Sequence, residues 1–138
     1  MDEKRLVEAA VSARKNAYAP YSGFSVGAAL LTGSGKVYLG CNIENAAFTP
    51  GNCAERTAIF KAVSEGERDF AAIAIVGAKK DEEISDYCSP CGVCRQVMME
   101  FCDPEKFRVI LAKSPDERKT LLLRDLLPYG FSGKNLDD

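Results

Sequence analysis

Cys53-Ala54-Glu55-Arg56 is the stretch from which the rest of this chain can be interpreted, because it places a metal-ligand type and a proton-transfer type two positions apart. Apolar residues recur at helical spacing over residues 54–63 and Gly66 supplies a stop, so Cys53 and Glu55 are predicted to lie in the first turn of a helix. The positive N-terminal end of a helix stabilises a thiolate, which disposes Cys53 to be an anionic ligand. Alone, however, a cysteine at a helix start is more often a small buried apolar residue.

A second stretch, Ser89-Pro90-Cys91-Gly92-Val93-Cys94-Arg95-Gln96, also opens a predicted helix, with its proline just ahead of the first turn. Cys91 and Cys94 have the C-x-x-C spacing of zinc ligands, and Cys53 adds a third thiolate from another helix. Three protein ligands with an open fourth position are typical of catalytic zinc, and a carboxylate such as Glu55 can handle the protons of a water molecule there. The apolar stripe expected along this helix consists of Val93, Val97, Met98 and Phe101.

The number of cysteines leaves two other interpretations open. Six cysteines in a chain of 138 residues can form a disulfide framework. However, the charged amphipathic N-terminus has no apolar signal core and no apolar stretch reaches membrane-spanning length. We therefore expect a reduced, cytoplasmic protein without a membrane partner, in which clustered cysteines bind metal.

Cys88 extends the second stretch to C-x-x-C-x-x-C, a spacing that also occurs in iron–sulfur proteins. A cluster or a structural zinc site, with Cys102 or Cys53 as the fourth ligand, is therefore the alternative from another class of protein. In such a protein Glu55 would have no part in the chemistry.

The composition predicts one domain spanning residues 1–138, because 46% apolar content is enough for one core and leaves little room for a second. The predicted order is a helix, a strand hairpin, a helix, a strand, a helix, a strand and a short strand-helix segment, which is an α/β order with helices on both faces of a mixed sheet. Both site helices follow strands, which places their N-termini together at the carboxyl edge of the sheet. The first helix is expected to carry a stripe of Leu6, Val7, Ala10, Val11, Ala13 and Ala17, and the strands to cover residues 24–31, 36–41, 70–76 and 107–112.

The charge balance favours a small-molecule substrate over nucleic acid. Lys and Arg number 18 and Asp and Glu number 20, so the formal net charge is −2. A domain that grips nucleic acid through its phosphates usually carries a basic excess. We therefore expect no nucleic-acid partner.

Three motifs, in order, make the chain resemble the small homotetrameric cytidine deaminases of the three-cysteine zinc type. The second and third contain Cys-Ala-Glu and Pro-Cys-x-x-Cys, the signature of zinc deaminases. The resemblance runs from the first helix to Leu126-Leu127-Pro128, nearly the whole chain. The motifs are Asn42-Ile43-Glu44-Asn45-Ala46-Ala47-Phe48, Cys53-Ala54-Glu55-Arg56-Thr57-Ala58 and Ser89-Pro90-Cys91-Gly92-Val93-Cys94-Arg95-Gln96.

The resemblance implies a three-layer α/β/α sandwich around a mixed five-stranded sheet. It also implies the hydrolytic deamination of cytidine and 2'-deoxycytidine to uridine and 2'-deoxyuridine in pyrimidine salvage, with one zinc ion per subunit. The ligands would be Cys53, Cys91 and Cys94, while Glu55 would act as both base and acid. Arg56 would offset the negative charge of three thiolates around one zinc ion.

The resemblance further implies which residues bind the substrate. Without it, an aromatic residue that opens a strand, such as Phe24, would be assigned to the core. Some aromatic residues would enter the pocket of a neighbouring subunit of the homotetramer. The implied set is Asn42 and Glu44 at the ribose hydroxyls, Phe24 at the base, and Phe48 and Phe131 across the subunit boundary, with Tyr129 as the alternative to Phe131.

Two other deaminase classes share parts of this pattern. Blasticidin-type deaminases have the Cys-Ala-Glu and Pro-Cys-Gly-x-Cys-Arg-Gln elements, but the stretch Asn42-Ile43-Glu44-Asn45 is typical of nucleoside binding. A polynucleotide deaminase is disfavoured by the charge and by the lack of an appended binding segment. The sequence does not distinguish a preference for cytidine from one for deoxycytidine.

Overall fold

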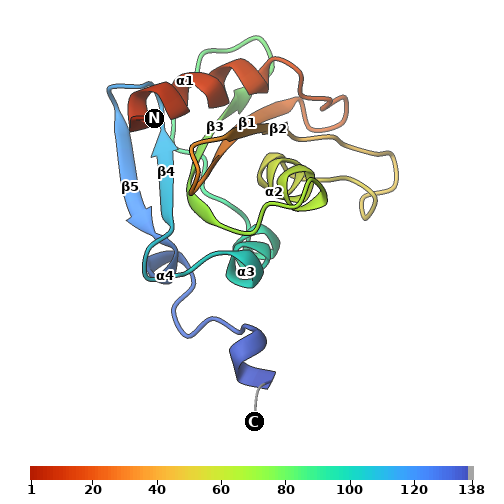
Figure 1. The fold of residues 1–138 in the computed structure, drawn as a ribbon. Coiled ribbons are helices and arrows are strands. Elements are labelled where there is room, and N and C mark those ends of the chain that lie inside the picture. The colour runs from red at the N-terminus through yellow and green to blue at the C-terminus, as the bar shows by residue number, and fades with distance from the viewer. Residues whose placement is uncertain (137–138) are drawn as a thin grey trace.

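Five strands form one mixed sheet with helices on both of its faces (Figure 1). The computed structural model describes residues 1–136. In chain order its elements are α1 (Glu3–Arg14), β1 (Phe24–Thr32), β2 (Val37–Cys41), α2 (Ala54–Ser64), β3 (Phe70–Lys79), α3 (Gly92–Phe101), β4 (Arg108–Ala112), β5 (Arg118–Leu122), α4 (Leu123–Leu126) and the 3-10 helix η1 (Gly133–Leu136).

The strand directions place the starts of α2 and α3 at one edge of the sheet. The strand order is β2-β1-β3-β4-β5. β2 and β3 both run antiparallel to β1, so they point the same way, and β4 runs parallel to β3. Since α2 follows β2 and α3 follows β3, both helices begin beyond the carboxyl edge of this sheet. The predicted α/β sandwich with a mixed five-stranded sheet is confirmed.

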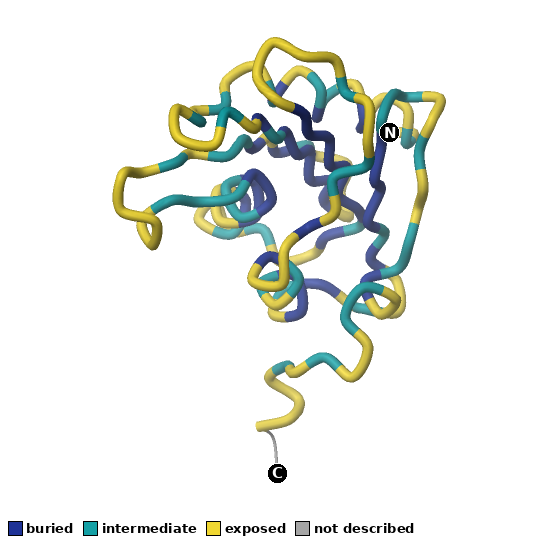
Figure 2. Tube along the Cα trace, turned by 180° about the vertical axis from the view of Figure 1, so that it is seen from behind, coloured by how far each residue is buried: buried dark blue, intermediate teal, exposed yellow. Residues whose placement is uncertain are grey.

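The core consists of two apolar layers, one on each face of the sheet. On one face, α1 packs Leu6, Val7 and Ala10 against the strands. On the other face, α2 and α3 contribute residues such as Ile59 and Met98. Figure 2 shows the buried residues gathered in the central strands and on the helix sides that face them, while most of the chain after α4 is exposed. Helices therefore cover both faces of β3, as its apolar run predicts.

Two glycines allow the helices to lie directly on the sheet. A Cβ atom at Gly40 in β2 would come within 2.3 Å of the Ala54 carbonyl oxygen and 2.6 Å of the Ala58 nitrogen in α2. A Cβ atom at Gly27 in β1 would come within 2.1 Å of the Ala10 carbonyl oxygen in α1. Such distances are far inside van der Waals contact, so any larger residue would force the layers apart.

Two predicted element boundaries are wrong. The first helix ends at Arg14 and does not include Ala17, because the chain turns away and the Tyr18 N–H donates to the Asn42 carbonyl. β3 does not stop before Gly77 but continues to Lys79, and Gly77 gives the strand room beneath Phe24 and Cys88. Three other strand ends differ by one residue from the expected positions.

The apolar stripe predicted for α3 is partly wrong as well. Val93 is 57% exposed, whereas Cys94, Met98 and Met99 are the buried residues of this helix. The buried face is rotated by one position because Cys94 points inward, toward the other site cysteines. Within residues 1–136, no helix is both long and apolar enough to cross a bilayer.

Gly40→Ala is expected to destabilise the protein by about 1–3 kcal/mol, because the new methyl group overlaps the backbone of α2. The measurement is the free energy of unfolding in urea. Gly133→Ala is the matched control, since nothing lies within 4 Å of a Cβ atom there, and its effect should stay within about 0.5 kcal/mol. Equal stability of the two variants would contradict the close approach of α2 to β2.

Candidate active site

Three cysteine thiols converge where α2 and α3 begin. Cys53 is the N-cap residue of α2, Cys91 is the N-cap residue of α3, and Cys94 lies in the first turn of α3. Their Sγ atoms all lie within 4.8 Å of one another, and the Cys53 and Cys91 Sγ atoms are 3.8 Å apart. All three cysteines are free thiols. Neither N-cap side chain accepts a capping hydrogen bond from the backbone of its own helix, so both sulfurs can serve as ligands.

The separation of the Cys53 and Cys91 sulfurs fits tetrahedral zinc. Zn–S bonds of about 2.3 Å at tetrahedral angles place two sulfurs roughly 3.8 Å apart. The Cys53 and Cys91 Sγ atoms have that separation, 3.8 Å. Thiolates are among the ligands that select zinc, and three of them leave a fourth position for water or substrate. The three-thiol group is therefore a suitable place for a catalytic zinc ion.

Arg56 stabilises negative charge on the sulfurs. Its Nη2 lies 3.3 Å from the Cys53 Sγ, and its Nε is buried with no hydrogen-bond partner among residues 1–136. Hydrogen bonding by the Cys94 thiol, together with the Arg56 guanidinium, lowers the pKa of Cys53 to about 5. The interaction with Cys53 in turn raises the pKa of Cys94. The group thus already favours a thiolate at Cys53 before any metal is considered.

Glu55 presents a buried carboxyl group next to the thiols. It is the second residue of α2 and only 4% exposed. Burial removes water from its carboxylate and raises the pKa of Glu55 to about 7. A carboxyl group with a pKa near neutral can both accept and donate a proton at working pH.

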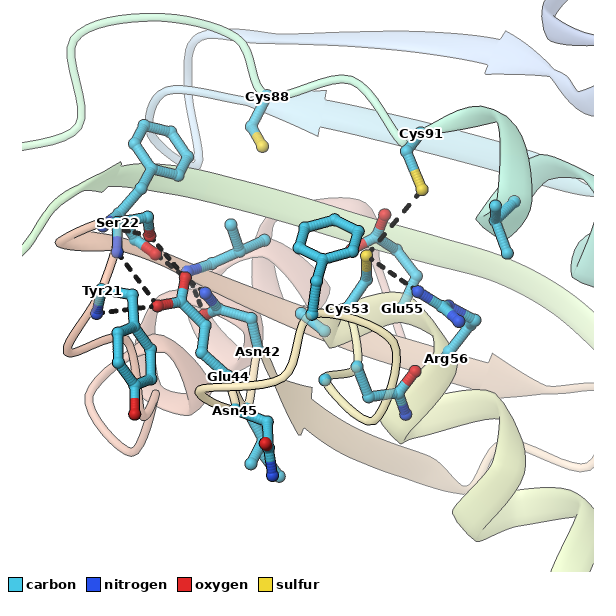
Figure 3. Close-up of a pocket in the computed structure, with 18 of the residues that line it drawn as sticks. Tyr21, Ser22, Asn42, Glu44, Asn45, Cys53, Glu55, Arg56, Cys88 and Cys91 are labelled. Atoms are coloured by element: carbon cyan, nitrogen blue, oxygen red, sulfur yellow. Dashed lines mark hydrogen bonds between the residues drawn. The ribbon is translucent and has the colours of Figure 1, made fainter.

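A cavity of about 730 Å³, which we call the main cavity, opens beside the thiols and Glu55 (Figure 3). Figure 3 shows Glu44 and Ser22 at one end, Cys53, Glu55 and Arg56 at the other, and Cys88 on the wall between them. Its volume suits a small-molecule ligand. The residues proposed from the sequence that line it are Phe24, Asn42, Glu44, Phe48, Cys53, Glu55, Arg56 and Cys91.

Asn42 and Glu44 are held in place by the start of β1 and the turn before it. Asn42 Oδ1 accepts a hydrogen bond from the Val26 N–H at 2.8 Å, and Asn42 Nδ2 donates to the Phe24 carbonyl at 2.8 Å. Glu44 Oε1 accepts from the backbone N–H groups of Tyr21 and Ser22, and its Oε2 accepts from the Ser22 hydroxyl. These bonds lower the pKa of Glu44, led by the one from the Ser22 side chain.

The aromatic residues proposed from the sequence divide into two groups. Phe24 and Phe48 line the main cavity, and Phe48 is 96% exposed at its rim. Phe131 is not among the lining residues, and its carbonyl oxygen accepts a hydrogen bond from Gln96 Nε2 at 2.8 Å. Tyr129 is fully exposed and adopts a positive φ of 56°. Neither C-terminal aromatic therefore enters the main cavity of its own chain.

The C-x-x-C-x-x-C run does not form one ligand set. Among the described residues, the only metal-capable group of this kind contains three cysteines, and Cys88 is not one of them. The Cys88 side chain instead lies over Gly77 and lines the main cavity, where burial raises its pKa to about 11. Cys102 is buried at the far end of α3. No fourth cysteine is thus available for a cluster within residues 1–136.

The local sequence pattern does not predict the contacts of several residues that shape this site. Tyr21 and Ser22 lie in the turn between α1 and β1, and their N–H groups hold the Glu44 carboxylate. Arg95 donates from its Nε to the Pro90 carbonyl at 2.8 Å and from its Nη1 to the Leu126 carbonyl at 2.7 Å. It thereby ties the turn before Cys91 to α4. Such partners are far apart in sequence, and no local pattern reveals them.

Comparison with known proteins gives consistent matches. Residues 1–110 match the family model described as the cytidine and deoxycytidylate deaminase zinc-binding region. The chain is 46% identical over 138 residues to a cytidine deaminase of Halalkalibacterium halodurans, with 100% of both chains covered. It is 46% identical over 136 residues to a cytidine deaminase of Sporosarcina psychrophila, which covers 99% of this chain and 96% of the relative.

Solved structures agree with these sequence matches. The crystal structure of a cytidine deaminase from Burkholderia pseudomallei is similar with a TM-score of 0.86 and 49% identity, over 95% of this chain and 100% of that one. A cytidine deaminase structure from Mycobacterium tuberculosis has a TM-score of 0.79 and 34% identity, over 95% of this chain and 98% of that one. The family model, the relatives and the three-thiol group with its neighbouring glutamate agree, and the chain belongs to the cytidine deaminase family.

Proposed function

We propose that this protein catalyses the hydrolytic deamination of cytidine and 2'-deoxycytidine to the uridine nucleosides and ammonia. One observation carries the proposal: two of the three convergent thiols, those of Cys53 and Cys91, line a single cavity together with a buried carboxyl group, and that cavity is large enough for a nucleoside. The family of the chain and its cytidine deaminase relatives support the same reaction.

Cys53, Cys91 and Cys94 are the residues that would hold one zinc ion per subunit. Bound there, zinc supplies an acidified water molecule as a nucleophile at neutral pH. Three thiolates around a divalent ion leave a net negative charge, which weakens its action as a Lewis acid. The Arg56 guanidinium, bonded to the Cys53 sulfur, withdraws part of that charge. Arg56 is therefore assigned a charge-compensating role.

Glu55 is assigned the proton transfers. Its carboxylate accepts a proton from the attacking water and delivers it to N3 of the pyrimidine while the C4–O bond forms. The second proton of that water then passes through the same carboxyl group to the exocyclic nitrogen, and the C4–N bond breaks to release ammonia. One water is consumed and one ammonia is formed, so Glu55 returns to its starting state.

The main cavity is assigned to the nucleoside. Reaction at C4 requires the base to point toward Glu55 and the thiols, so the sugar lies toward Asn42 and Glu44 at the other end. The Glu44 carboxylate can accept a hydrogen bond from a sugar hydroxyl, and Asn42 retains one N–H donor after its bond to the Phe24 carbonyl. Phe24 would lie against the base.

We further propose a homotetramer of single-domain subunits, acting in pyrimidine salvage in the cytoplasm. The exposed aromatic residues Phe48 and Phe131 support association between subunits, because each presents an apolar ring to solvent in the single chain. Phe131 of one subunit, or Tyr129 in its place, would then enter the main cavity of another.

Glu55→Gln should lower the rate of cytidine deamination by about 10²–10⁴-fold, since the amide cannot carry protons between water and base. The measurement is the loss of the ultraviolet band of cytidine, with zinc content determined on the same samples. Glu65→Gln, at the exposed C-terminal end of the same helix, is the control and should remain active. A zinc-loaded, active Glu55→Gln variant would refute the role of Glu55. No turnover by the zinc-loaded wild-type protein would refute the substrate.

Cys91→Ser should lose most of its bound zinc, whereas Cys88→Ser should retain about one zinc per chain, because only Cys91 belongs to the three-thiol group. Metal analysis of the purified variants gives the answer directly. Equal zinc loss in the two variants would contradict the ligand assignment. A brown protein with iron in place of zinc would favour the cluster alternative.

Phe131→Ala should raise the KM for cytidine by about tenfold if its ring completes a neighbouring cavity, as expected for an anchoring aromatic residue at an interface. Tyr129→Ala is the paired variant, and the larger effect identifies the cross-subunit aromatic. Light scattering on both variants reports the oligomeric state. A fully active monomer would contradict the shared cavity.

A further inference from the structure

We propose that Arg14 is a positioning residue for nucleoside binding, although it lies on α1 and does not line the main cavity. It would act through the backbone that carries Phe24. The inference rests on the proposed function, because it assigns to Phe24 the contact with the base described above.

The Arg14 guanidinium binds four backbone carbonyl groups at once. Its Nε donates to the Ser25 carbonyl at 3.0 Å, and its Nη2 lies 3.2 Å from the Ala78, 2.7 Å from the Lys79 and 3.1 Å from the Glu82 carbonyl oxygens. These acceptors belong to the start of β1, the end of β3 and the loop that follows. One side chain of α1 therefore joins the start of β1 to the end of β3 and the loop that follows it, segments more than 50 residues apart in sequence.

Close packing of α1 on β1 brings Arg14 to this place. A Cβ atom at Gly27 would come within 2.6 Å of the Arg14 nitrogen and 2.9 Å of its Cα. The last turn of α1 therefore lies directly over β1, and the side chain extends from it to the carboxyl edge of β3. Within residues 1–136, Arg14 has no carboxylate partner within salt-bridge distance, so its interactions here are with the backbone.

Three of the four carbonyls that Arg14 binds, those of Ser25, Ala78 and Lys79, belong to the last two residue pairs of the β1–β3 ladder. Phe24 pairs with Lys79 and Ser25 pairs with Ala78. Strand ends fray easily because they have few neighbours to hold them. A guanidinium has donors in a planar fork that can bind several acceptors in fixed directions, which a lysine ammonium cannot match. Arg14 therefore fixes the end of the ladder at Phe24.

Phe24 depends on this fixation because cavities lie on two sides of it. Its side chain lines the main cavity and also a second one of about 260 Å³, the rear cavity, which Gly77, Glu82 and Tyr87 help to line. The ring is 38% exposed, so packing alone does not determine its position. Its backbone is what holds it, and that backbone is tied to Ser22 and Asn42 as well as to the segments bound by Arg14.

Arg14→Met should raise the KM for cytidine by about tenfold and change kcat by less than about threefold, since the variant loses binding common to ground state and transition state. Zinc content should stay equal to that of the wild-type protein. Arg68→Met is the matched control, because Arg68, within the described part of the chain, likewise donates only to backbone carbonyls, those of Val63 and Glu67. Arg68 precedes β3, however, and so lies at the opposite edge of the sheet from the main cavity. The KM of this variant should not change.

A double-mutant cycle with Phe24→Ala separates positioning from general loss of stability. If Arg14 acts through Phe24, Arg14→Met should have little further effect on KM in the Phe24→Ala background. Arg14→Lys, which keeps the charge but not the fork, should give an intermediate KM. It replaces Arg14→Met in the cycle if that variant does not fold.

Additive effects on KM in the cycle, or an unchanged KM in Arg14→Met, would overturn the inference. A fall in kcat that tracks zinc loss would overturn it as well, because Arg14 would then act on the metal end of the site. These outcomes require a wild-type protein that deaminates cytidine in the same assay. Absence of wild-type turnover would instead count against the proposed function itself.

Discussion

The common direction of β2 and β3 is the constraint on which the site depends. Both strands pair antiparallel with β1, so two helices separated by a long stretch of sequence start at one edge of the sheet. Each start exposes N–H groups that favour a nearby anion, and each carries a cysteine as its N-cap residue. The positive ends of two helices therefore favour negative charge at the same place. Gly40 lets α2 lie close enough to β2 for the sulfurs to come together.

The two ends of the main cavity are built in different ways. At the end near the thiols, which we call the metal end, a thiol of lowered pKa, a buried carboxyl group and a guanidinium with a buried Nε adjoin one another. At the end lined by Asn42 and Glu44, the polar groups are partly exposed and are tied to the backbone of β1 and of the turn before it. Chemistry requires perturbed proton affinities, which burial supplies, whereas recognition of hydroxyl groups requires fixed donors and acceptors, which a strand end supplies.

Much of the fold follows from local pattern, since helical spacing in α1 and α2 and the apolar run of β3 fix their type and their buried faces. The fold could be predicted to this extent because the spacing of apolar residues in each of these elements matches the side of the element that is buried. The errors lie where a distant neighbour decides: β3 continues through Gly77 because Phe24 and Cys88 pack over it, and Val93 faces out because Cys94 turns in. The metal end of the site was equally predictable, since its residue types and spacing are restrictive. The hydrogen-bond partners of Glu44 and Arg14 were not predictable, because they lie in segments far apart in sequence that no local spacing of residues connects. Phe131 stays a prediction, since its assigned contact lies in another subunit.

The hydrogen bonds around Asn42 and Glu44 also bear on the entropy of ligand binding. Ordering a flexible side chain during association costs about 0.5–1.5 kcal/mol in lost rotamer freedom. Both heavy atoms of the Asn42 amide and both oxygens of Glu44 are already bonded within the chain, so this ordering takes place when the protein folds. The direction of the Asn42 amide is fixed by its two backbone partners as well, which leaves one orientation for an arriving hydroxyl group. The Asn42 and Glu44 end of the main cavity is thus preorganised, so these two side chains have little rotamer freedom left to lose when a ligand binds.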